Sequence, residues 1–262
     1  MKLFTLFMLF SAPLFGGVTD SGLKQISLND KLRIRAFVEI NLKWHQLAHV
    51  IYFDNKPMCL TSARLKSPDK QSMDVYWIKG WRAFKKNEHL FPHPNFIFNT
   101  EIDEDQEGWK SINLVIVNKR ALVKCLNNHL CFFQEVLDED FSCDWFISEL
   151  ERNKNIFTIL KNDERLIGIL LGYGKESASV FRNHQILNPD ILLSDDANTY
   201  CPIDAQAPKG CKFFPIVIMG NPHSEEVQNL MSIYDKELEE FWSVYRNRDP
   251  LELFLKCICG ES

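Results

Sequence analysis

The sequence predicts an α+β fold in which a small mixed or antiparallel sheet packs against several helices. Three observations indicate this class. Of 262 residues, 45% are hydrophobic and 25% are charged, which is ordinary globular composition. Short apolar runs typical of strands occur between residues 49 and 117, and a long amphipathic helix is predicted near the C-terminus. No Gly/Ser linker or repeat divides the chain, so we expect one α+β domain over 18–262 after a signal segment at 1–17.

The chain begins with the pattern of a signal segment. Lys2 carries one positive charge, and the apolar run Leu3–Phe10 follows it. The apolar stretch spans about 16 residues, whereas a helix that crosses a membrane needs about 20. We therefore expect export to the periplasm or the medium, which a reporter active only outside the cytoplasm and fused after residue 25 would test.

The cleavage site of this segment departs from the usual pattern. A cut after Gly16 or Gly17 would leave Leu14 or Phe15 three residues before the cut, where a small residue is preferred. Retention as an uncleaved signal anchor therefore stays open. Membrane contact is expected only through this segment.

The first element of the domain is expected to be a helix over 28–44. Ser27 and Asp30 resemble a capping box at its start. Apolar residues in this stretch also alternate with polar ones, which is the period of a strand. A resemblance described below favours the helix.

A β-hairpin is predicted next. His49–Phe53 and Met58–Ser62 are short apolar runs, and Asp54-Asn55-Lys56-Pro57 between them is typical of a turn. Lys56 and Pro57 are candidate ligand-binding or structural residues, because loops often carry function. We expect the Lys56 side chain to be exposed.

The rest of the domain is expected to contain mainly helices. The expected helices cover 70–86, 119–137, 143–160 and 163–184. The expected strands cover 96–102, 112–117 and 213–219, with an acidic turn at 103–107 and a long loop at 188–212. Gly168, Gly172 and Gly174 interrupt the helix over 163–184.

The clearest element is an amphipathic helix that begins after Ser224. Ser224 can cap it, and Glu225 and Glu226 suit the positive end of its dipole. Its apolar residues recur at steps of three and four. They are Val227, Leu230, Met231, Tyr234, Leu238, Phe241, Trp242 and Tyr245.

The charge balance argues against nucleic-acid binding. The formal net charge is −5, from 30 Lys and Arg against 35 Asp and Glu. Nucleic-acid binding normally rests on clustered basic residues. We expect no nucleic-acid partner, and the oligomeric state is left open.

The eight cysteines are compatible with disulfides in an exported protein. Cys201 and Cys211 bracket a short Pro-rich loop and are the preferred pair. The alternative is that several cysteines are small buried apolar residues.

The sequence contains no complete motif for a metal site or a phosphate-binding loop. Cys125, His129 and Cys131 could hold zinc, but no second pair of ligands has suitable spacing. The segment Gly168–Ser177 lacks the spacing of a phosphate loop, so its glycines more simply mark close helix packing or a helix end. We expect no cofactor and no metal, and we assign no catalytic residue.

Two segments resemble a family of uncharacterised exported proteins of chlamydia-related intracellular bacteria. Members share a turn reading LFG-x-KP and a segment reading ILLGYG-K-E-N-A. Here the corresponding segments are His49–Met58 and Leu166–Ala178, followed by a strand, Pro222 and the long C-terminal helix. Asp54 stands where the family has Gly, and Ser177 where it has Asn.

The resemblance implies a bacterial exported protein with a helix before the first strand. It transfers no activity, cofactor or catalytic residue. It does draw attention to the second turn, Gly172-Tyr173-Gly174-Lys175, as a further candidate ligand-binding or structural segment.

Two functions are compatible with these features. The first is a non-catalytic exported protein that binds a host or envelope partner. The alternative is a secreted hydrolase or transferase with a site near Lys56-Pro57 and Gly172–Lys175. Whether the protein is an enzyme is left open by the sequence.

Overall fold

The computed structural model describes residues 17–44, 47–65, 72–104, 108–187, 200–202, 217–219 and 224–261. The helices are α1 Val18–Gln25, α2 Leu28–Trp44, α3 Leu47–Ile51, α4 Met73–Asn87, the 3-10 helix η1 Glu88–Leu90, α5 Lys119–Val136, α6 Cys143–Glu151, α7 Ile156–Ile159, α8 Glu164–Leu170, α9 Lys175–Leu187, α10 Glu225–Tyr245 and α11 Pro250–Cys259. The strands are β1 Met58–Arg64, β2 Phe96–Glu104, β3 Lys110–Asn118, β4 Tyr200–Pro202 and β5 Val217–Met219.

A three-stranded antiparallel sheet lies at the centre of the fold. Its order is β1-β3-β2, and Val117 of β3 faces Met58 of β1 and Ile97 of β2. Residues 114–117 of the central strand are all buried, so both faces of the sheet are covered there. This arrangement confirms the predicted α+β class with a small antiparallel sheet.

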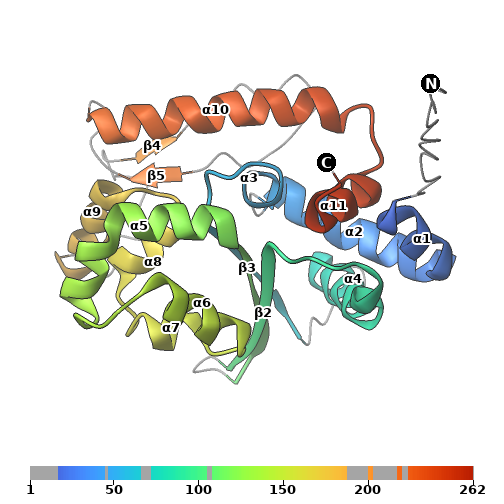
Figure 1. The fold of residues 1–262 in the computed structure, drawn as a ribbon, viewed down its shortest axis with the longest axis horizontal. Helices are drawn as coiled ribbons and strands as arrows, with labels where there is room; N and C mark the ends of the chain where they lie inside the picture. The colour runs from blue at the N-terminus through green and yellow to red at the C-terminus, as the bar shows by residue number, and fades with distance from the viewer. Residues whose placement is uncertain are drawn as a thin grey trace, which may run out of the picture.

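Two hydrophobic cores lie against opposite faces of this sheet. Cys59, Phe98 and Ile116 join the first core, which α2, α4 and α11 complete. Alternate residues such as Ile97 and Val115 join the second core, which α5, α6 and α8 complete. In Figure 1 the sheet accordingly lies between the α2, α4 and α11 group and the α5 to α9 group.

The predicted helix over 28–44 is confirmed as α2. The Asp30 backbone N–H donates to Ser27 Oγ at 3.1 Å, which caps the helix as expected. Gly80 of α4 lets the two helices approach, because a Cβ there would lie 2.4 Å from the carbonyl oxygen of Arg33. The Trp77 indole then donates to Asn41 Oδ1 at 3.1 Å inside the core.

The predicted β-hairpin over 49–62 is wrong in its first half. Residues 49–51 belong to the short helix α3, all five residues of which are buried. In a short run that is apolar throughout, no alternation of apolar and polar residues distinguishes a helix from a strand. Strand β1 exists, but it pairs with β3.

Two other expected helices are each divided. The helix expected over 143–160 is divided into α6 and α7. The break lies at Asn153, which has a φ of +57°, and Asn155 then caps α7. The helix expected over 163–184 breaks between α8 and α9 at Gly172 and Gly174. Gly168 does not interrupt it; this residue lies within α8 and packs closely against Ala178 of α9.

The strands over 96–102 and 112–117 and the helices over 70–86 and 119–137 are confirmed as β2, β3, α4 and α5. Within the expected loop at 188–212 only β4 is described, and only Val217–Met219 of the expected strand at 213–219 is described. Helix α11 was not predicted, although the Asp249 cap, Pro250 and Gly260 are typical signals for it.

Helix α10 crosses both halves of the molecule, as Figure 1 shows. Ser224 Oγ accepts from the Val227 backbone N–H at 3.3 Å, so the predicted cap is confirmed. Phe241 enters the first core, while Tyr234 packs beside Tyr173 of the α8–α9 turn. None of the helices in the described part of the chain has the length and apolar character to cross a membrane.

Candidate functional site

The structure brings the two candidate turns together. A Cβ added to Gly172 would lie 3.3 Å from Lys56 Cγ and 2.3 Å from the hydroxyl oxygen of Tyr234. The turn before β1 and the turn between α8 and α9 therefore meet under α10. Six candidate residues from two distant segments form one region: Lys56, Pro57, Gly172, Tyr173, Gly174 and Lys175.

Asn118, at the end of β3, holds the first turn. Its backbone N–H donates to the Pro57 carbonyl at 2.8 Å. Its side-chain Nδ2 donates to the Val50 carbonyl at 2.9 Å and to Asp54 Oδ1 at 3.1 Å, while its Oδ1 caps α5. A single buried amide thus ties the turn to α3 and α5.

Two residues of α10 hold the second turn. Gly172 and Gly174 have φ values of +79° and +82°, a conformation that glycine adopts without strain. The Tyr234 hydroxyl donates to the Gly172 carbonyl at 2.6 Å. Glu226 accepts from the backbone N–H groups of Lys175 and Glu176 at 3.0 and 2.7 Å, which satisfies the first turn of α9.

A pocket of about 220 Å³ opens where the turns meet, and we call it the turn cleft. Asn55 and Pro57 line it from the first turn, and Gly172 and Gly174 from the second. Helix α5 contributes Lys124, Cys125, Asn128 and His129, and α10 contributes Leu230, Ile233 and Tyr234.

A polar cluster, made of the buried His49, Lys56, Tyr234 and Glu237 and the exposed Asn55, adjoins the turn cleft. His49 Nδ1–H donates to Glu237 Oε2 at 2.6 Å, and Asn55 Nδ2 donates to Glu237 Oε1 at 2.6 Å. His49 and Glu237 are only 6% and 4% exposed. Asn55 and Tyr234 belong to both the polar cluster and the cleft lining, so hydrogen bonds of the cluster support the cleft wall.

Lys56 is buried, which corrects the expectation of an exposed side chain. Only 1% of its surface is exposed, and its Nζ lies 5.4 Å from the ring centre of Tyr173 and 5.9 Å from that of Tyr234. Burial lowers the pKa of Lys56 to about 8. Lys175 is exposed as expected, with its Nζ 4.5 Å from the ring centre of Phe132.

Burial shifts the pKa values of several titratable groups on the cleft wall. Burial raises the pKa of Cys125 to about 12, and the thiol donates to the Ile169 carbonyl at 3.9 Å. Burial also raises the pKa of Tyr234 above its ordinary value. Burial lowers the pKa of His129, which favours its neutral form. Near neutral pH the described wall therefore offers hydrogen-bond donors and one cation, Lys124.

The proposed zinc ligands are not assembled into a site. Cys125 and His129 line the turn cleft, whereas Cys131 is exposed elsewhere on α5. Within the described ranges no group of three or more His, Cys, Asp or Glu residues is placed to hold a metal. The six cysteines with described side chains are free thiols, while the side chains of Cys201 and Cys211 lie outside the described residues.

Glu237 was not among the candidate residues predicted from the sequence, and His49 was expected in a strand. A signal for Glu237 was present, because it falls on the buried stripe between Tyr234 and Phe241, where a carboxylate needs a partner. His49 was assigned to a strand that does not exist. Asn118 could also have been found, since Asn directly before an apolar helix is a typical cap.

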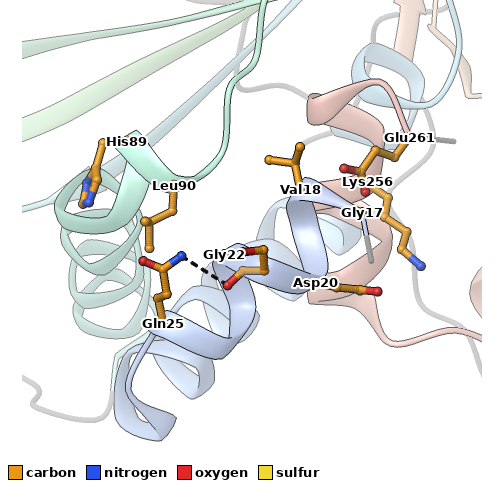
Figure 2. A pocket seen from close by; sticks show the side chains of 10 residues that line it. Gly17, Val18, Asp20, Gly22, Gln25, His89, Leu90, Lys256 and Glu261 are labelled. Atoms are coloured by element: carbon orange, nitrogen blue, oxygen red, sulfur yellow. Dashed lines mark hydrogen bonds between the residues drawn. The ribbon is translucent and has the colours of Figure 1, made fainter. Parts of the chain in front are cut away.

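A wider groove lies at the other end of the molecule. It has a volume of about 790 Å³ and is formed by α1, η1 and the end of α11. Figure 2 shows Gly17 beside Glu261, whose Oε1 accepts from the Thr19 backbone N–H at 3.1 Å. Glu261 therefore caps α1 and joins the C-terminal end of the described chain to its beginning.

The fold and the turn cleft define the chain as an α+β protein with a small surface pocket whose wall is held by hydrogen bonds. Comparison with models of protein families, with curated proteins and with solved structures finds no match to this chain.

The burial of His49 predicts a loss of stability in acid. Burial, more than any other effect, lowers the pKa of His49 below its ordinary 6.5. As the pH falls below 6.5, the unfolded chain takes up a proton at this residue before the folded chain does, so the free energy of unfolding falls. We expect His49→Gln to remove up to about 1 kcal/mol of the change between pH 6.5 and 5.5, measured by urea unfolding.

The comparison with His49→Gln separates this histidine from the others. The pKa of His129 is also lowered, whereas that of His93 is raised and opposes the effect. Both of these residues are present in wild type and variant. Equal losses in the two proteins would show that His49 does not contribute.

Proposed function

We propose that this protein is exported and acts as a non-catalytic binding protein, with the turn cleft receiving one side chain of a protein partner. The proposal rests on one observation: residues of both candidate turns line the same pocket, and hydrogen bonds hold its wall. Asn118, Tyr234, Glu226 and Glu237 hold that wall through buried or partly buried hydrogen bonds. A preformed pocket binds at a low entropic cost.

The size of the turn cleft favours a single side chain over a whole small molecule. Its volume is about 220 Å³, whereas pockets for drug-sized ligands span about 300–1,000 Å³. Protein interfaces commonly insert one large side chain into a pocket of this kind, and such anchors supply much of the binding energy. The exposed Ile233, at 40% exposure, offers apolar area at the edge.

The chemistry of the wall indicates which side chain suits it. Pro57 and Leu230 are apolar, and Asn128 and His129 add polar groups. Lys124 is the charged side chain among the described lining residues, and its Nζ donates to Asn55 Oδ1 at 3.2 Å. An anchor with an apolar body and a hydroxyl at its tip, such as tyrosine, fits this combination. A cationic anchor would be repelled by Lys124.

The residues of the cleft wall favour a binding function over the alternative of a secreted hydrolase or transferase. A cysteine nucleophile needs a lowered pKa, but burial raises the pKa of Cys125 to about 12. His49 is bonded to Glu237, and neither residue lines the cleft. The turn cleft therefore has the features of a recognition pocket.

Filling the cleft mouth should abolish binding of a matching probe. Asn127 and Asn128 are neighbouring exposed residues of α5, but only Asn128 lines the turn cleft. We expect N-acetyl-tyrosine amide to shift the backbone amide signals of Gly174 and Ile233 in NMR spectra, and Asn128→Trp to remove these shifts. Asn127→Trp should leave them unchanged.

A second probe tests the chemistry of the anchor. N-acetyl-lysine amide should shift the same amide signals at least about tenfold less at equal concentration, because its charge repels Lys124. Equal shifts with both probes, no shifts with either, or persistence of the shifts in Asn128→Trp would each contradict the proposal.

A further inference from the structure

A separate pocket lies where the α5–α6 connection meets the end of α7. Its volume is about 350 Å³, within the range for small ligands. Two aromatic residues, Phe141 and Trp145, and two carboxylates, Asp138 and Asp140, line it together with Ile159 and Lys161. We call it the Trp145 pocket. None of these residues belongs to the turn cleft.

The aromatic wall of the Trp145 pocket is rigidly supported. Phe141 is buried and stacks on Phe133 with ring centres 5.4 Å apart, and it also contacts Phe146 at 5.6 Å. Trp145 meets Phe141 edge to face at 5.9 Å, yet 47% of Trp145 remains exposed. A packed stack of buried rings thus presents one half-exposed indole at the pocket.

The carboxylates lie on a turn that its own bonds fix. The Phe141 backbone N–H donates to the Asp138 carbonyl at 3.0 Å, and the Asp140 backbone N–H donates to Asp138 Oδ1 at 3.3 Å. The one basic side chain in the lining, Lys161, donates through Nζ to the Leu137 carbonyl. With two carboxylates and one ammonium, the described lining has a net charge of −1.

From this combination we infer that the Trp145 pocket binds a small organic cation of the alkylammonium class. The face of an indole ring attracts a cation, and the attraction grows as the cation loses water. The nearby carboxylates add attraction for positive charge, and the apolar wall receives the alkyl groups. An anionic ligand would be repelled by the same carboxylates.

The probe is choline, compared with its neutral carbon analogue 3,3-dimethylbutan-1-ol. The full chain is labelled with 5-fluorotryptophan, so that each of its 6 tryptophans gives a fluorine NMR signal. Trp145→Phe assigns the signal of Trp145. We expect choline to shift this signal at least about tenfold more strongly than the neutral analogue, which corresponds to the contribution of the charge.

Substitutions of two neighbouring acidic residues test whether the Asp140 carboxylate contributes to binding. Asp140 lines the pocket, whereas Glu139 is exposed beside it and does not. Asp140→Asn should weaken choline binding several-fold, while Glu139→Gln should leave it within about twofold of wild type. n-Butylammonium should bind as well if the alkylammonium charge is what the pocket recognises. Equal binding of the neutral analogue, or no shift at Trp145 with either cation, would overturn the inference.

Discussion

Replacing Gly172 by alanine is expected to lower the free energy of unfolding by about 2–4 kcal/mol. Gly172 has a φ of +79°, which costs any other residue about 1 kcal/mol. A Cβ at this position would also lie 2.3 Å from the Tyr234 hydroxyl oxygen. Tyr234 must then move, and its buried bond to the Gly172 carbonyl is lost at a further cost of about 1–3 kcal/mol. Urea unfolding measures the change.

Gly260 provides the matched control for this prediction. It has a φ of +74° at the end of α11, and a Cβ there would meet nothing within 4 Å. Gly260→Ala should therefore cost only about 1 kcal/mol, the contribution of the backbone alone. Equal costs for the two variants would show that the contact between Gly172 and Tyr234 adds no stability. Gly172→Val should lower thermal stability further, because its side chain is larger.

Replacing Glu237 by alanine is expected to cost about 3–5 kcal/mol. Its two carboxylate oxygens each accept one 2.6 Å bond, from His49 and from Asn55. Its negative charge also acts on buried Lys56, whose pKa it raises against the effect of burial. Removing one member of a buried ionic group is costly, because the remaining polar atoms and charge lose their compensation. The measurement is again the free energy of unfolding in urea.

Exposed acids of the same helix provide the control for Glu237. Glu239 and Glu240 lie on the solvent side of α10. Glu239→Ala and Glu240→Ala should each change the free energy of unfolding by no more than about 0.5 kcal/mol. If Glu237→Ala fell within the same range, the polar cluster would not be the structural support of the turn cleft.

Several elements could be predicted because their signals are local. Helix α10 carries its cap at Ser224 and a regular apolar stripe within its own residues. Strands β2 and β3 are neighbouring apolar runs, and antiparallel pairing of such neighbours needs no distant partner. These assignments depend on residues a few positions apart, which the printed sequence displays directly.

The candidate site could be predicted only in part. The turns at Lys56-Pro57 and Gly172–Lys175 were chosen from turn-forming residues and from a resemblance, and the structure brings them together. The partners that support them, His49 and Glu237, were not identified. Their bond joins residues 188 positions apart, and no local pattern specifies such a pair.

By itself the sequence determined the α+β class, the helices α5 and α10 and the strands β2 and β3, because hydrogen bonds and apolar periods within each element decide them. Only the tertiary structure decided that residues 47–51 form a helix, that Lys56 is buried and that Glu237 bonds to His49. In each case the contacts that decide the outcome come from a distant segment. A short apolar run or a single charged residue has too little local preference to oppose them.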